Sequence, residues 1–341
     1  MAVRLKDIAE EVGYSVNTVS KALSGKGQEA GIATKTCNFI IARAKKMGYR
    51  PNLFARSLGG GQSNIIGLLV SQIDDDFYVP IIYQLERVLM DKGFIPFLGF
   101  LSSEEEENVQ SISMLLQLNI RAVVLIGDKG EISSPVIADI WPKNIPVLAV
   151  GALGKQRKDI YTLPIDYYSG GYQAVEHLIK TGHREIAFVE SFAKNKENSE
   201  KQKGWMAAIG NYGVQLDDQL LFACEEENLF ESSAEVVDYL LMLPSLPSAV
   251  VCFNDMVAFG IIRALRKNGL SVPNDISIMG FRDSPAAENY NPALSTIRIP
   301  AELISENVVE FIKNPDKFRS ANNKTVTPQL MIRESTEIEK L

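Results

Sequence analysis

From Ile65 onward the chain alternates between short apolar runs and longer stretches with one apolar face, and this alternation constrains the fold most strongly. Runs such as Ile65–Val70 and Ala122–Ile126 are apolar throughout, which is typical of strands buried on both faces. Strands that alternate with helices form parallel sheets covered by helices. The alternation restarts near Tyr168, so we expect two similar α/β lobes, with a ligand cleft outside the carboxyl ends of their strands.

The pattern predicts the following elements. The expected strands cover residues 65–70, 94–100, 122–126, 147–150, 161–165, 185–190, 219–223, 249–253 and 277–281. The expected helices cover residues 78–92, 103–118, 136–141, 168–181, 200–212, 233–241 and 255–268.

The first 50 residues follow a different pattern, because Leu5–Leu23 predicts two short helices joined by a tight turn at Gly13. Ser15 is a good N-cap for the second helix. The expected buried stripes of the two helices are Ile8, Ala9 and Val12, then Val19, Ala22 and Leu23. This is the pattern of a helix-turn-helix, whose second helix lies in the DNA major groove; two ordinary surface helices are the alternative.

A third helix is expected over residues 34–47, with Phe39, Ile40, Ala44 and Met47 in the core and Gly48 after its end. Residues 49–58 predict a further short helix, followed by Gly59, Gly60 and Gly61 as a flexible link. Such a short helix is not stable alone in water. It therefore needs a partner, such as its twin in a dimer together with DNA.

The charge is divided unevenly along the 341 residues, whose formal net charge is −7. Residues 1–60 contain ten Lys and Arg against four Asp and Glu, a formal charge of +6, and the remainder carries −13. A basic head on an acidic body indicates that the head alone contacts a polyanion such as DNA.

Other features exclude several classes of protein. The three cysteines are far apart and form no CxxC pair, which fits a reducing cytoplasm. We see no signal peptide and no apolar run long enough for a membrane span, so a cytoplasmic location is expected. His177 and His183 are too few for a His-based metal site, and no nucleophile motif or P-loop is visible. We therefore expect no enzyme activity, no cofactor and no metal.

Short motifs in the same order along the whole chain carry a family resemblance. In the head they are Lys6-Asp7-Ile8-Ala9, Gly13, Ser15-Val16, Thr18-Val19-Ser20, Gly48-Tyr49-Arg50-Pro51-Asn52 and Ala55-Arg56-Ser57-Leu58. In the body they include Ile66-Gly67-Leu68-Leu69-Val70, Gly170-Gly171, Gly182-His183-Arg184, Gly204-Trp205, Asn254-Asp255, Gly280-Phe281 and Arg333-Glu334-Ser335-Thr336. With these motifs the chain resembles the lactose-repressor (LacI/GalR) family of bacterial transcription regulators.

The resemblance implies an all-α helix-turn-helix head and an α/β core like periplasmic sugar-binding proteins, with two doubly wound parallel-sheet lobes. We expect the DNA-binding head at residues 1–50, a hinge helix and linker at 51–63, and the effector-binding and dimerisation core at 64–341. Three crossovers would divide the core into one lobe at about 64–165 and 295–325, and another at about 166–294 and 326–341.

The resemblance also implies DNA contacts. Val16, Asn17 and Lys21 would face base edges, because Asn pairs with adenine and Val suits a thymine methyl. Lys21 stands where the family usually has Arg, so it lacks the fork that reads guanine. The expected phosphate contacts are Thr18, Ser20 and Asn52, with Arg56 in the hinge. Leu58 resembles the hinge leucine that wedges into the minor groove at the centre of the operator.

Two positions of the third helix also depart from the family. Cys37 stands where a basic residue is usual, and Ala33 stands where a capping Ser is usual. We expect both changes to weaken the helix's contact and its cap.

Six residues are expected near the effector: Phe77, Tyr78, Lys201, Asn254, Asp255 and Arg282. Asp255 is alternatively a helix cap. Lys201 and Arg282 both depart from the family pattern, and Arg offers only donors. One hypothesis is that they hold an anionic effector, such as a sugar acid or sugar phosphate. The alternative is that Arg282 pairs with a local acid, namely Asp74, Asp75, Asp76 or Asp283.

The resulting hypothesis is a homodimeric repressor that binds a pseudo-palindromic operator and responds to a sugar or sugar-derived effector in the cleft. The effector would act by a population shift, and both release and promotion of DNA binding are compatible with the resemblance. The alternatives are an effector-independent or protein-corepressor-controlled member of the same family, a solute-binding protein, and an enzyme on the same scaffold. Because no leucine-heptad helix follows Thr336, we expect a dimer rather than a tetramer.

Overall fold

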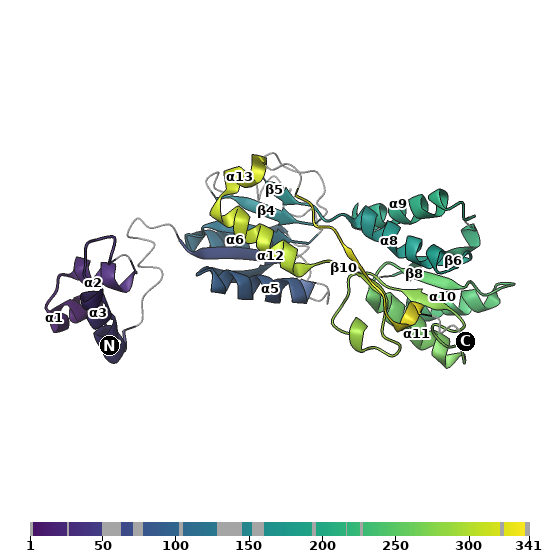
Figure 1. The fold of residues 1–341 in the computed structure, drawn as a ribbon, viewed down its shortest axis with the longest axis horizontal. Coiled ribbons are helices and arrows are strands. Elements are labelled where there is room, and N and C mark those ends of the chain that lie inside the picture. Colours follow the sequence, from purple (N-terminus) through teal and green to yellow (C-terminus); the bar gives the residue numbers. More distant parts are fainter. Residues whose placement is uncertain are drawn as a thin grey trace. The chain divides into compact units, whose positions relative to one another are not determined.

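The computed structural model of the chain describes residues 3–25, 27–49, 63–70, 78–101, 105–127, 145–151, 160–192, 196–215, 217–225, 228–320 and 324–337 (Figure 1). The chain divides into two compact units, residues 1–63 and residues 64–341. Each unit is described by itself below, as the head and the core.

The head has the three expected helices, α1 (Leu5–Val12), α2 (Val16–Leu23) and α3 (Thr34–Lys46). Gly13 ends α1 with a left-handed backbone (φ 71°), and the Ser15 hydroxyl accepts a hydrogen bond from the Thr18 N–H at 3.1 Å. The small core that holds the three helices together consists of Ile8, Ala9, Val12, Val19, Ala22, Cys37, Ile40 and Ala44.

The predicted core stripe of α3 is wrong at Phe39, whose side chain is 51% exposed. Cys37, Ile40 and Ala44 form the buried stripe instead, at the spacing of a single helix face. Cys37 fits because Gly27 lies against its sulfur, where a Cβ on Gly27 would come within 2.3 Å. Cys37 is therefore a core residue. Ala33 precedes α3 without a side-chain cap, as expected from its methyl group.

The first lobe of the core contains a parallel five-stranded sheet in the order β2-β1-β3-β4-β5. Its strands are β1 (Ile65–Val70), β2 (Ile95–Phe100), β3 (Ala122–Ile126), β4 (Val147–Val150) and β5 (Tyr161–Leu163). Its helices include α5 (Tyr78–Asp91), α6 (Glu105–Gln117), α12 (Ala301–Lys313) and α13 (Pro315–Ser320). The expected helix at 136–141 lies outside the described residues. Since α12 packs on α5, the C-terminal part of the chain completes this lobe.

The second lobe contains a parallel four-stranded sheet in the order β7-β6-β8-β9. The strands are β6 (Ile186–Ser191), β7 (Leu221–Cys224), β8 (Ala249–Cys252) and β9 (Ser277–Met279). The helices α8 (Tyr167–Lys180) and α9 (Lys196–Asn211) lie on one face, and α10 (Leu229–Met242) and α11 (Asp255–Lys267) lie on the other (Figure 1). The predicted start of α9 at residue 200 is a full turn too late, which matters for the site below.

Three chain segments lie side by side between the lobes. Val326 pairs with the segment around Ile165, where its carbonyl accepts the Asp166 N–H at 3.0 Å. The strand β10 (Thr296–Arg298) pairs antiparallel with β11 (Gln329–Met331). The expected fold class is confirmed: an all-α head and a core of two parallel-sheet α/β lobes.

Two kinds of feature are absent from the described residues. No helix among them is long and apolar enough to cross a membrane. They also contain no group of three or more His, Cys, Asp or Glu arranged to hold a metal ion.

Candidate functional site

The second helix of the head presents a polar surface to solvent. Asn17 and Lys21 are exposed and Val16 is 45% exposed, whereas Val19 and Ala22 on the other side are buried. Thr18 and Ser20 are half-buried, and the Thr18 hydroxyl lies 2.8 Å from that of Ser15. Five of the residues predicted to contact DNA therefore lie on α2, three of them with exposed side chains.

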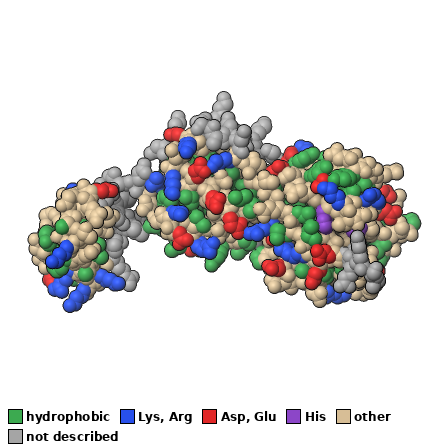
Figure 2. Space-filling view, viewed as in Figure 1, with side chains coloured by type: hydrophobic (Ala, Val, Ile, Leu, Met, Phe, Trp, Pro, Cys, Tyr) green, Lys and Arg blue, Asp and Glu red, His purple; other side chains and the backbone are tan. Residues whose placement is uncertain are grey.

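The head also carries exposed cations on its other helices and on its N-terminal segment. Figure 2 shows several Lys and Arg side chains on the visible face of the head. The exposed cations among the described residues of this unit are Arg4, Lys6, Lys21, Lys35, Lys45 and Lys46. Arg43 forms an ion pair with Glu11 that ties α3 to α1. The other predicted DNA contacts, Asn52, Arg56 and Leu58, lie outside the described residues.

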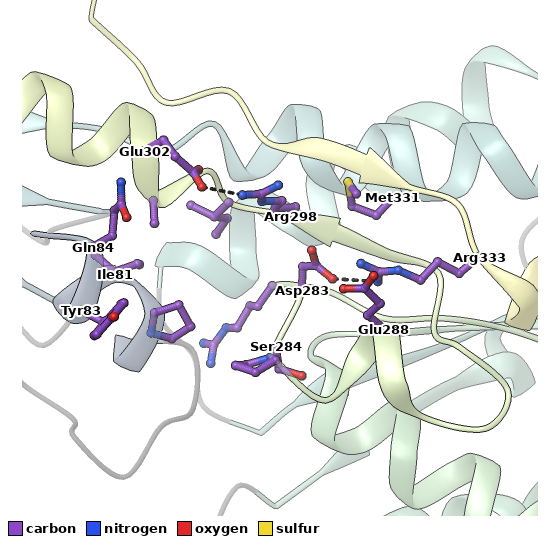
Figure 3. A pocket seen from close by; sticks show the side chains of 15 residues that line it. Ile81, Tyr83, Gln84, Asp283, Ser284, Glu288, Arg298, Glu302, Met331 and Arg333 are labelled. Atoms are coloured by element: carbon purple, nitrogen blue, oxygen red, sulfur yellow. Dashed lines mark hydrogen bonds and ion pairs between the residues drawn. The ribbon is translucent and has the colours of Figure 1, made fainter. Parts of the chain in front are cut away.

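A pocket of about 520 Å³ lies between the two lobes of the core. One wall is formed by α5, and the other by residues 282–285 and Glu288 of the second lobe. Figure 3 shows Ile81, Tyr83 and Gln84 on one side of the pocket and Asp283, Ser284 and Glu288 on the other. The start of α12 and the crossover strands complete the lining with Arg298, Ile299, Ala301, Glu302, Met331 and Arg333. A ligand in this pocket would touch both lobes.

Every arginine in the pocket lining has an acidic partner. Arg298 pairs with Glu302 at 2.7 Å. Arg333 pairs with Asp283, also at 2.7 Å. Arg282 pairs with Glu197, a residue of α9 behind the pocket wall, at 3.1 Å. The cations of this pocket are therefore held by acids of the protein.

The backbone of α9 is held against α8 by two glycines. A Cβ on Gly171 of α8 would lie 2.4 Å from the Lys201 carbonyl oxygen, and a Cβ on Gly204 of α9 would lie 2.1 Å from that of Tyr168. Only glycine permits backbones to approach this closely. The close packing fixes α9, and with it Glu197 and Lys201, under the pocket.

Glu197 and Lys201 lie one turn apart on α9 and are both fully buried. The Lys201 ammonium donates to Glu197 Oε1 at 2.5 Å and to the Phe253 carbonyl at 3.1 Å. It also lies 4.3 Å from the centre of the Phe281 ring. Arg282 directs Nε and Nη2 to the same Glu197 oxygen, at 3.4 and 3.1 Å. Although burial opposes ionisation, the cations Arg282 and Lys201 bring the pKa of Glu197 down to about 2.

This ion cluster bears on both sequence hypotheses for Arg282. The Lys201 ammonium is buried in the protein, and the local acid that pairs with Arg282 is Glu197 rather than Asp283. Asp283 pairs with Arg333 instead, and Asp74, Asp75 and Asp76 lie outside the described residues. The spacing of Glu197 and Lys201, four residues apart, was the signal that sequence reasoning missed, because the predicted α9 began after Glu197.

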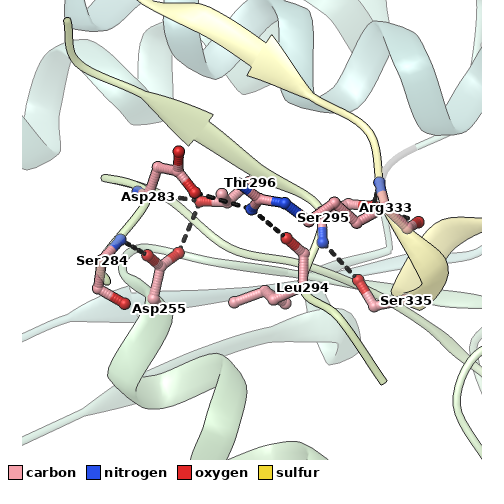
Figure 4. A network of polar contacts seen from close by, with 8 residues as sticks. All are labelled: Asp255, Asp283, Ser284, Leu294, Ser295, Thr296, Arg333 and Ser335. Atoms are coloured by element: carbon pink, nitrogen blue, oxygen red, sulfur yellow. Dashed lines mark hydrogen bonds and ion pairs between the residues drawn. The ribbon is translucent and has the colours of Figure 1, made fainter. Parts of the chain in front are cut away.

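Asn254 and Asp255 divide their roles at the start of α11. Asn254 caps the helix by accepting the Val257 N–H at 2.9 Å, so the alternative role of Asp255 as the cap is wrong. Asp255 instead accepts the Ser284 N–H at 2.5 Å and the Thr296 hydroxyl at 2.6 Å (Figure 4). It thereby joins α11 to the pocket wall and to the crossover β10. Burial raises the pKa of Asp255 to about 6.

The C-terminal motif anchors the last crossover to the second lobe (Figure 4). Arg333 Nη1 donates to Asp283 and to the Leu294 carbonyl, at 2.7 and 2.8 Å. The Ser335 hydroxyl accepts the Ser295 N–H at 2.8 Å and donates to the Ile278 carbonyl at 2.7 Å. The segment Arg333–Thr336 therefore fixes one wall of the pocket.

The remaining candidates serve the interior of the core. Tyr78, the first residue of α5, is buried, and Phe77 lies outside the described residues. His177 Nε2 lies 3.1 Å from the Thr336 hydroxyl, and His183 Nδ1 lies 3.0 Å from that of Ser248. Burial lowers the pKa of both histidines. Their partners are single hydroxyls that join separate segments of the second lobe.

Two family models match the chain. Residues 4–52 match the model of bacterial regulatory proteins of the lacI family, and residues 175–336 match a periplasmic binding protein-like domain. The first match covers the three helices of the head, and the second covers most of the second lobe together with α12 and the C-terminal motif.

Relatives match the chain over almost its whole length. It is 29% identical to the HTH-type transcriptional regulator AscG of Escherichia coli, over 96% of this chain and 97% of that protein. It is 28% identical to the HTH-type transcriptional regulator DegA of Bacillus subtilis, over 98% of both chains. The solved structure of the lac repressor dimer bound to operator and an anti-inducer has the same fold, with a TM-score of 0.80 and 22% identity over 98% of this chain and 99% of that chain.

These matches agree with the helix-turn-helix head, with the two-lobed core and with the order of motifs from the first helix to the last crossover. The relatives are transcriptional regulators rather than enzymes. The chain therefore combines a DNA-binding domain of the lacI family of bacterial regulatory proteins with a periplasmic binding protein-like domain, and it is similar to transcriptional regulators along almost its whole length.

Proposed function

We propose that this regulator is a homodimeric repressor that binds a pseudo-palindromic operator and is controlled by a sugar or sugar-derived molecule in the pocket between its lobes. The observation that carries the proposal is the separation of two surfaces. The exposed polar face of α2 lies on a basic head, and the pocket lies in a separate unit, between two lobes.

In the head, Val16, Asn17 and Lys21 read base edges, since their side chains are exposed on α2. Thr18, Ser20, Asn52 and Arg56 position the head on the backbone, and Leu58 enters the minor groove between the two half-sites. We assign DNA binding to residues 1–50, the hinge to residues 51–63, and effector binding and dimerisation to residues 64–341.

In the core, control follows from a pocket that both lobes line. A ligand that contacts α5 and residues 282–285 at once favours one separation of the lobes over another, and its differential affinity for the two states sets the size of the response. The class of ligand is supported by a solved neighbour described as a transcriptional regulator in complex with cellobiose, which has a TM-score of 0.67.

The proposal is tested by electrophoretic mobility shift with DNA from upstream of the protein's own gene. We expect sequence-specific binding that weakens steeply with salt, because Lys and Arg contacts to phosphate release counterions. Unrelated DNA of equal length is the competitor control. Binding that does not distinguish the two DNAs would contradict the proposal, and sedimentation of a stable tetramer would contradict the dimer.

A further inference from the structure

The pocket between the lobes is balanced in charge although it is rich in arginine. Its lining contains Arg282, Arg298 and Arg333, and it contains Asp283, Glu288 and Glu302. The formal charges of these six side chains cancel. Behind the wall, the charges of Glu197 and Lys201 also cancel, so the described residues of this part of the core present no net positive charge to a ligand.

Glu197 is central to this balance because it engages the two cations that the sequence hypothesis assigned to an anionic effector. One of its oxygens accepts from Lys201 and from both Nε and Nη2 of Arg282. The Arg282 side chain is 14% exposed and lines the pocket, whereas that of Glu197 is 2% exposed. Glu197 therefore holds Arg282 from behind, in the position that a ligand's carboxylate or phosphate would need to take over.

We infer that Glu197 is an internal counterion that makes this pocket select neutral, hydroxyl-rich ligands and reject anionic ones. The inference rests on the proposed control by a small molecule and replaces the hypothesis that Lys201 and Arg282 hold an anionic group. Glu197 acts through Arg282 and is a specificity-determining residue.

The physical reason is the repulsion between like charges when one of them, the Glu197 carboxylate, is buried. An anion beside Arg282 either displaces Glu197, leaving this buried carboxylate with Lys201 as its remaining ion-pair partner among the described residues, or stays close to Glu197 and is repelled. A neutral sugar avoids both costs, because its hydroxyls donate to carboxylates and accept from guanidinium groups without changing the net charge. The apolar lining by Ile81, Ile299 and Met331 suits the C–H face of a sugar ring.

The test is to convert the specificity by substituting Glu197→Gln, with Glu200→Gln as the matched control. Glu200 lies on the same helix but pairs at the surface with Lys203, so its substitution removes an equal charge outside the pocket. Glucose and glucuronate are a matched pair of probes, because they differ in the carboxylate, and inorganic phosphate is a third probe. Binding is measured by calorimetry and by the shift in melting temperature, at constant ionic strength.

We expect Glu197→Gln to bind glucuronate or phosphate at least tenfold more tightly than the wild-type and Glu200→Gln proteins do. An equal affinity of all three proteins for the anions would overturn the inference, as would wild-type protein that binds glucuronate more tightly than glucose. The double variant Glu197→Gln, Lys201→Met covers the case in which the loss of the Glu197 charge beside the buried Lys201 ammonium prevents folding. It removes both charges of this buried pair and keeps Arg282, and we expect the same gain in anion affinity.

The mobility shift on the wild-type protein separates this inference from the proposed function. If the wild-type protein binds its upstream DNA specifically and Glu197→Gln gains no anion affinity, the inference fails alone. If the wild-type protein shows no specific DNA binding, the proposed function fails, and a gain of anion affinity in Glu197→Gln still supports the role of Glu197 in the pocket.

Discussion

The polar residues of α2 and those of the second lobe face opposite environments. On α2, Asn17 and Lys21 project into solvent and are held in place by the apolar residues behind them. In the second lobe, Glu197, Lys201 and Asp255 are buried. Glu197 and Lys201 are hydrogen-bonded to each other, and Asp255 accepts a hydrogen bond from the Ser284 N–H. A substitution on α2 therefore alters what the protein can bind, whereas a substitution in the second lobe first alters how the protein folds.

The largest test of this difference is Glu197→Ala. The change leaves Lys201 and Arg282 without their shared carboxylate, so we expect the core to lose about 3–5 kcal/mol of unfolding free energy. The control Glu200→Ala breaks a surface pair with Lys203 and is expected to cost less than about 1 kcal/mol. Both values are measured by urea denaturation followed by circular dichroism. Equal losses in the two variants would show that the buried cluster is not special.

A second test leaves every charge in place and changes only the packing that positions them. In Gly204→Ala the new methyl group meets the backbone of α8 at Tyr168, and α9 must move away. We expect a loss of about 3 kcal/mol. Gly210 lies on the same helix with open space around it, so Gly210→Ala is expected to stabilise the core by about 0.5–1 kcal/mol. If thermal melting shows the same sign for both, the contact between α8 and α9 does not hold the ion cluster.

The contrast between the two regions also explains what the sequence could predict. The three head helices and most strands could be predicted from local periodicity, because the spacing of apolar residues indicates which face of a helix or strand is buried. The exposed face of α2 could be predicted in the same way, because it lies opposite the apolar residues Val19 and Ala22. Phe39 was misplaced because helix phase, and not hydrophobicity, decides which side of α3 is buried.

The pocket was harder to predict because its residues meet through tertiary contacts. Arg282 and Glu197 are far apart in sequence, and nothing local to Arg282 indicates this partner. The roles of Asn254 and Asp255 depend on Thr296 and Ser284, which the topology brings to them. Resemblance to a family directed attention to these segments of the chain, but the partners that determine the chemistry of their residues come from the fold.

A third test uses pH to follow a buried group without removing its side chain volume. The pKa of Asp255 is raised from 3.8 to about 6 in the native state, so the native state binds its proton more tightly than the unfolded chain does. This contribution to stability is fully present below about pH 4 and is lost as the pH rises to about 6.

We therefore expect the unfolding free energy of the wild-type protein to increase relative to Asp255→Asn as the pH falls from 6 to 4, by up to about 3 kcal/mol. Urea titrations at intervals across this range measure the difference. Glu197, whose pKa is lowered from 4.5 to about 2, is present in both proteins, so its own contribution cancels from the difference. A constant difference between the two proteins would show that Asp255 is ionised throughout.

The smallest expected effect tests the other side of the comparison, at Asn17 on α2. Asn17→Ala removes an exposed amide, so we expect the melting temperature of the head to stay unchanged. Specific DNA affinity is expected to fall by about 1–3 kcal/mol, while affinity for unrelated DNA is retained, because a base contact distinguishes sequences and a phosphate contact does not.

The matched control is Asn38→Ala, which removes an exposed amide on α3. Fluorescence anisotropy with both DNAs measures the ratio. A loss of stability, or an equal loss of affinity for both DNAs, would place Asn17 with the residues that hold the protein together or position it, and not with those that read sequence.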